Sequence, residues 1–117
     1  QAPKSMNGKQ FMFFDWVNGG GAEVDDVISV VKLLSNNKGE QRSIINNRLM
    51  LEFNYSYKST ARVAQFDINA VVDGNSVTGI YQLHFFTNSG GIFFGTTIYP
   101  DFPEDGYTLL SGGFIME

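Results

Sequence analysis

The sequence predicts an α+β fold in which one helix packs on a curved antiparallel sheet of five to six strands. Two observations carry this prediction. Residues 49–98 divide into four alternating segments joined by short turns, and residues 22–39 show apolar and polar side chains at roughly helical spacing. At 117 residues, with 43% hydrophobic content, the chain has the size of one domain with a buried core. We therefore expect a single globular domain at 11–117, preceded by a flexible N-terminal segment at 1–10.

The first strand is expected at 11–17, an aromatic segment with the sequence FMFFDWV. The helix is expected at 22–39, with the sequence AEVDDVISVVKLLSNNKG. Acidic residues at 23–26 favour a helix N-terminus, and Gly39 supplies a C-terminal stop. Five β-branched residues in the same stretch favour a strand instead, but strict alternation fails at 27–28 and 30–31. On balance this pattern predicts a helix.

Three two-residue turns set the register of the four strands that follow. They are expected at 59–60, 73–74 and 89–90, and Asp73-Gly74 is the strongest hairpin pattern of the three. The first turn pairs Lys58 with Ala61 and so places Glu52 opposite Asp67. With this register most apolar residues share one face, the expected core: Leu49, Leu51, Phe53, Tyr55, Ala64, Phe66, Ile68, Ala70, Val77, Tyr81, Leu83, Phe85, Ile92, Phe94 and Ile98.

One helix on such a sheet is the roll architecture of cystatin-like and NTF2-like folds, a comparison that implies no function. The alternative is a closed all-β barrel in which residues 24–34 form a strand. The segment NSGGIFFG at 88–95 resembles the glycine-rich turn of allene oxide cyclase and dirigent barrels. The resemblance covers eight residues and assigns no family.

The opposite face of the predicted sheet mixes amides, aromatic rings and few charges, which is typical of a surface that contacts a ligand. Its rows place Gly95 opposite His84, which leaves space above the imidazole. The residues expected to bind a ligand are Asn54, Gln65, Gln82, Phe86, Phe93 and Tyr99.

The opposed carboxylates carry the one catalytic hypothesis. Glu52 and Asp67, if partly enclosed, would titrate as a coupled pair, and His84 is the nearest general base. The same carboxylates have two other interpretations: they bind Ca²⁺ with amide oxygens, or they have no function and are either neutralised by a neighbouring cation or turned apart into water. The last interpretation is the most common for such pairs. We expect no cofactor and no metal.

Charge and composition exclude several classes. The net charge is −4 and the eight basic residues are scattered, so neither nucleic acid nor an anionic membrane surface is an expected partner. No apolar run approaches the roughly 20 residues that span a bilayer. The chain has no cysteine and begins at Gln1, which fits a secreted or periplasmic protein; a cytoplasmic one is the alternative.

These observations predict a small soluble binding module whose polar-aromatic sheet face holds a small, partly apolar ligand, a glycan or a protein. One alternative is a cofactor-free isomerase, cyclase or dehydratase that uses Glu52, Asp67 and His84. Another is a structural domain that forms a homodimer through the same face.

Overall fold

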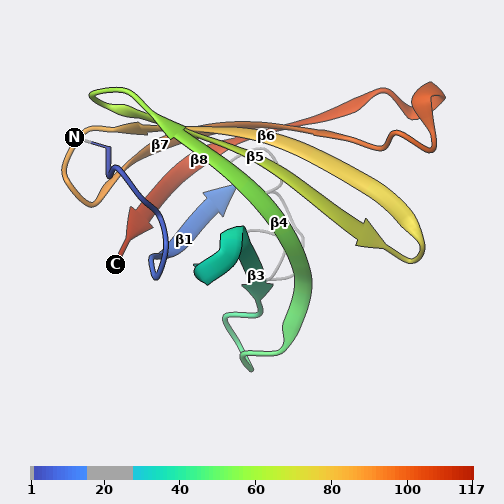
Figure 1. The fold of residues 1–117 in the computed structure, drawn as a ribbon, viewed down its shortest axis with the longest axis horizontal. Helices are drawn as coiled ribbons and strands as arrows, with labels where there is room; N and C mark the ends of the chain where they lie inside the picture. Colours follow the sequence, from blue (N-terminus) through green and yellow to red (C-terminus); the bar gives the residue numbers. More distant parts are fainter. Residues whose placement is uncertain (1, 16–27) are drawn as a thin grey trace.

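The computed structural model describes residues 2–15 and 28–117, which form a closed antiparallel β-barrel of eight strands in chain order (Figure 1). β1 pairs with both β2 and β8 and so closes the barrel. The strands are β1 (Gln10–Asp15), β2 (Ile28–Leu33), β3 (Lys38–Arg42), β4 (Leu49–Ser59), β5 (Val63–Val72), β6 (Asn75–Phe85), β7 (Gly90–Ile98) and β8 (Tyr107–Met116). The prediction of a helix on a five- to six-stranded sheet was wrong, and the alternative, an all-β barrel, is confirmed.

The segment predicted as a helix forms two strands instead. Residues 22–27 lie outside the described residues, 28–33 are β2, and β3 begins at Lys38 after a short 3₁₀ turn (Ser35–Asn37). Most of β2 is half-buried on both faces, so its β-branched side chains need not alternate with polar ones. Gly39 ends no helix. It lies opposite Phe53, whose ring occupies the space that a Cβ would need.

The predicted turn at Asp73-Gly74 is confirmed. Val72 lies opposite Asn75, and both turn residues have positive φ, 51° at Asp73 and 81° at Gly74. A type I′ turn requires this backbone conformation at both central positions, and Asp-Gly adopts it readily. The register between β5 and β6 is therefore the one that the sequence predicts.

The turn between β4 and β5 is longer than predicted. Lys58 lies opposite Gln65 and not opposite Ala61, because the Thr60 amide donates to the Val63 carbonyl (2.9 Å) and closes a wider loop. The register therefore shifts by four residues. An even shift leaves every side chain on its predicted face, so Phe53, Tyr55 and Phe66 are buried as expected.

The turn between β6 and β7 is also longer than predicted, and here the difference places the side chains of β7 on the opposite faces from those predicted. The Phe86 and Thr87 amides both donate to the Gly90 carbonyl (3.0 and 3.2 Å), and Gln82 lies opposite Phe94 and not opposite Thr97. This shift of three residues is odd, so it exchanges the two faces of β7. Phe93 is buried, whereas Phe94 and Ile98, both predicted in the core, are 50% and 40% exposed.

An aromatic cluster fills one end of the barrel, and residues 2–9 lie across that end. Phe11, Phe85 and Phe114 form edge-to-face and tilted ring contacts in the cluster. Met6 is buried, and the phenol groups of Tyr55 and Tyr57 donate to the Asn7 side chain and the Pro3 carbonyl. These contacts join the N-terminal segment to the barrel core.

Candidate functional site

The barrel interior contains a cavity of about 350 Å³ above the aromatic cluster. Its walls are mostly apolar, with rings from β1, β4, β5 and β7: Phe11, Phe13, Phe53, Phe66 and Phe93. Phe13 and Phe93 meet edge to face, with centroids 5.1 Å apart. Antiparallel alternation explains this lining, because every second residue of each strand points inward.

Four polar side chains also line this cavity. Asp15 follows Phe13 on the inner face of β1, and Ser29 lies opposite Phe13 on β2. Gln41 on β3 donates from Nε2 to the Ser29 hydroxyl (3.1 Å). Since Phe11 marks the end covered by residues 2–9, the register places Asp15 and Ser29 toward the opposite end. Tyr81 supplies the fourth polar group, from β6.

Tyr81 is held in place by two glycines and one hydroxyl. It lies opposite Gly95 on β7, and its ring occupies the space where Cβ atoms at Gly95 and Gly79 would lie. An aromatic ring that covers a glycine on the neighbouring strand is a known stabilising arrangement in sheets. The Tyr81 hydroxyl pairs with the Thr97 hydroxyl at 3.1 Å. Burial raises the pKa of Tyr81 above its ordinary value of 10.0; the hydrogen bond with Thr97 opposes this shift in part, and the nearby Tyr99 and Asp15 add to it.

This raised pKa predicts a loss of stability at alkaline pH. The folded state favours the neutral phenol, so the stabilisation is complete below pH 10 and is lost as the pH rises through the folded-state pKa. Tyr81→Phe should lessen the fall in unfolding free energy between about pH 9 and about pH 11. Urea titrations at both pH values measure this. Equal falls in wild type and Tyr81→Phe would contradict the prediction.

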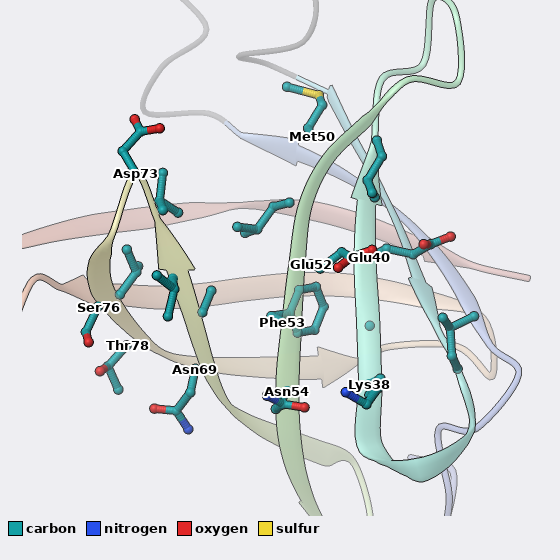
Figure 2. A pocket seen from close by; sticks show the side chains of 18 residues that line it. Lys38, Glu40, Met50, Glu52, Phe53, Asn54, Asn69, Asp73, Ser76 and Thr78 are labelled. Atoms are coloured by element: carbon teal, nitrogen blue, oxygen red, sulfur yellow. The ribbon is translucent and has the colours of Figure 1, made fainter.

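A second hollow, an open groove of about 820 Å³, lies where β4 and β5 separate (Figure 2). Pairing between these strands begins at Phe53 and Ala70. Before this point, residues 49, 51 and 52 of β4 pair with β3, with a bulge at residue 50, while residues 71–72 of β5 pair with β6. The groove has a mixed lining, with Met50, Phe53, Asn54 and Asp73 among the labelled side chains. It adjoins the interior cavity, because residues 50, 51 and 53 line both.

The acidic pair in the structure is not the predicted one. Glu52 lies opposite Glu40 on β3, beside the groove (Figure 2), while Asp67 lies opposite Ser56 and Ile80. The Arg42 guanidinium donates to both carboxylate oxygens of Glu40 (2.9 and 3.3 Å), which offsets the like-charge contact. Asp67 accepts from Gln65 (3.1 Å). Within residues 2–15 and 28–117, no group of three or more His, Asp or Glu side chains is arranged to hold a metal ion.

The other predicted site residues are spread over several surfaces. Gln82 lies opposite Gln65 and donates to its side-chain oxygen (3.4 Å). Asn54 lines the groove opposite Asn69, and Phe93 faces the interior cavity. His84 lies opposite Val63 and touches the edge of Phe94. Phe86 and Tyr99 are 69% and 37% exposed, and both lie outside the two hollows.

The predicted residues therefore share no single pocket, and their roles stay predictions. Sequence reasoning missed Ser29, Gln41 and Tyr81 as cavity-lining polar groups. The alternation of Phe11, Phe13 and Asp15 already placed a carboxylate on the face of two inward rings, and it was the one available pointer to this cavity.

Comparison of the chain with protein-family models, with curated proteins and with solved structures finds no match. Among the described residues, no helix has the length and apolar character needed to cross a membrane.

Proposed function

We propose that this protein is a binding module that holds a small, partly apolar molecule inside the barrel. The observation that carries the proposal is the interior cavity of about 350 Å³ with its aromatic walls. Ligand pockets in proteins usually measure about 300–1,000 Å³, and an apolar cavity of about 150 Å³ already accepts benzene. The cavity is therefore large enough for a molecule of one or two rings.

The polar groups favour a ligand with a hydrogen-bond donor or a positive charge. The Asp15 carboxylate accepts hydrogen bonds and supplies negative charge, while the Ser29–Gln41 pair offers a further hydroxyl and amide. A ligand whose apolar ring stacks among Phe13, Phe66 and Phe93 would direct its polar group toward these polar side chains. An anionic ligand would meet the negative charge of Asp15, so we expect it to bind weakly.

Titration with 2-naphthylmethylamine and 2-naphthoate tests this proposal, because the two probes share a ring system and differ in charge. The amine should shift the ring resonances of Phe13, Phe66 and Phe93 in NMR spectra, and the carboxylate should bind at least about tenfold more weakly. In Asp15→Asn the two affinities should converge. Binding of neither probe, or shifts confined to the outer surface, would overturn the proposal.

Filling the cavity should abolish most of this binding. Val31 lines the cavity from β2, so Val31→Phe places a ring in the space that the ligand would use. We expect the affinity for 2-naphthylmethylamine to fall by about tenfold or more, measured by calorimetry. The matched control is Val71→Phe, since Val71 is 69% exposed and does not line the cavity. Equal affinities in the two variants would place the ligand elsewhere.

A further inference from the structure

The outer face of β6, β7 and β8 is a broad surface without Asp, Glu, Lys or Arg. The three strands are neighbours in the barrel (Figure 1), and their pairing defines four rows of outward side chains, with a fifth row at the β6–β7 loop. The rows are Thr78–Ile98–Tyr107, Ile80–Thr96–Leu109, Gln82–Phe94–Ser111, His84–Ile92–Gly113 and Phe86–Gly90–Ile115. We call this surface the neutral face.

Large apolar side chains on the neutral face are strongly exposed. Seven of them expose 40–69% of their surface: Ile80, Phe86, Phe94, Ile98, Tyr107, Leu109 and Ile115. Since a whole aromatic side chain buries about 150–250 Å², the seven together offer on the order of 700 Å². The largest apolar patch on a typical monomer is about 300–600 Å². The exposed apolar area of the neutral face is therefore larger than the largest apolar patch expected on a monomer.

We propose that the neutral face packs against the neutral face of a second copy of the chain. A standard interface buries about 800 Å² per partner, close to the apolar area exposed here. Two chains of net charge −4 repel each other, and a contact surface without charged residues is where that repulsion costs least. The face spans three paired strands, and two such sheets pack about 10 Å apart, as in a β-sandwich.

A two-fold axis makes this interface self-complementary, so each substitution acts twice. Leu109 and Phe94, which are 59% and 50% exposed, lie in the central rows of the face. A glutamate at either position would bring like charges into an apolar contact in both protomers. The side chains point outward, so the fold of each protomer should tolerate the change.

Sedimentation velocity of the full chain from about 10 μM to about 1 mM tests the proposal. The wild type should approach twice the chain mass of 13.0 kDa, while Leu109→Glu and Phe94→Glu should remain at one chain mass. Val71→Glu is the matched control, because Val71 is 69% exposed on β5 and lies outside the neutral face. This variant should associate as the wild type does.

An independent measurement needs no variant. In a sample that mixes labelled and unlabelled wild-type chains, intermolecular NOEs should connect the methyl groups of Ile80, Ile98 or Leu109 with the partner. A single-chain mass at about 1 mM would overturn the proposal. Dissociation by Val71→Glu, or a dimer that survives both face variants, would also overturn it. Because the ligand cavity is interior, Leu109→Glu should still bind 2-naphthylmethylamine, so this proposal and the proposed function fail separately.

Discussion

Phe11→Ala is expected to lower the free energy of unfolding by about 3–5 kcal/mol. The ring is 1% exposed and contacts three others: it stacks on Phe13 (5.5 Å between centroids) and meets Phe66 and Phe114 at 6.1 Å. Truncation removes the transfer free energy of the ring and leaves a void that rigid neighbouring strands cannot close. Urea unfolding followed by near-UV circular dichroism measures the change.

Phe102→Ala is the matched control, because the same atoms are removed from a ring that is 40% exposed and precedes the short 3₁₀ turn Pro103–Asp105. Its effect should stay below about 1 kcal/mol. All titrations use one protein concentration, since self-association would add to the apparent stability of each variant. A loss below about 1 kcal/mol in Phe11→Ala would show that Phe11 is not part of a packed core.

Turn chemistry decided how much of the fold could be predicted from the sequence. At Asp73-Gly74 the backbone requirement of the turn and the residue types agree, so the predicted register of β5 and β6 is confirmed. The turns after β4 and β6 contain no residue pair that demands a two-residue loop, and both are longer than predicted. Because side chains alternate between the two faces of a strand, the even register shift between β4 and β5 left Phe53 in the core. The odd shift between β6 and β7 buried Phe93 and exposed Phe94.

The helix prediction failed for a related reason. A strand that is half-buried on both faces does not alternate strictly between apolar and polar residues. The resulting pattern in 28–34 resembles the spacing of apolar residues in a helix. The β-branched residues in that stretch favoured a strand, and this local preference was the better guide.

The candidate site depends on closure, which the sequence pattern did not specify. Asp15 and Tyr81 line one cavity only because β1 returns to pair with β8, and this contact joins residues about 100 positions apart. By contrast, the predicted acidic pair depended on a local turn. Because that turn is longer than predicted, Asp67 lies opposite Ser56 instead of Glu52, and Glu52 lies opposite Glu40.

Gly112→Ala tests closure directly and should lower the unfolding free energy by about 3 kcal/mol. Gly112 lies opposite Asp15 on β1 and Phe93 on β7. A Cβ at this position would overlap the Phe14 carbonyl and lie 3.0 Å from the Phe93 ring, so the backbones of β1 and β8 must move apart. Backbone atoms cannot rotate aside as the end of a flexible side chain can, which is why one methyl group has so large an effect.

Hydrogen exchange shows which strands Gly112→Ala destabilises. Amides of β1 and β8, including the Glu117 amide that donates to the Gln10 carbonyl (2.8 Å), should lose protection before those of the β5–β6 hairpin. Ser111→Ala, a change at the neighbouring outward position, should leave both stability and protection nearly unchanged. Affinity for 2-naphthylmethylamine should fall in Gly112→Ala, because Asp15 and Phe93 both face the cavity beside this seam. Unchanged exchange at β1 and β8 would mean that the two strands do not approach as closely as a closed barrel requires.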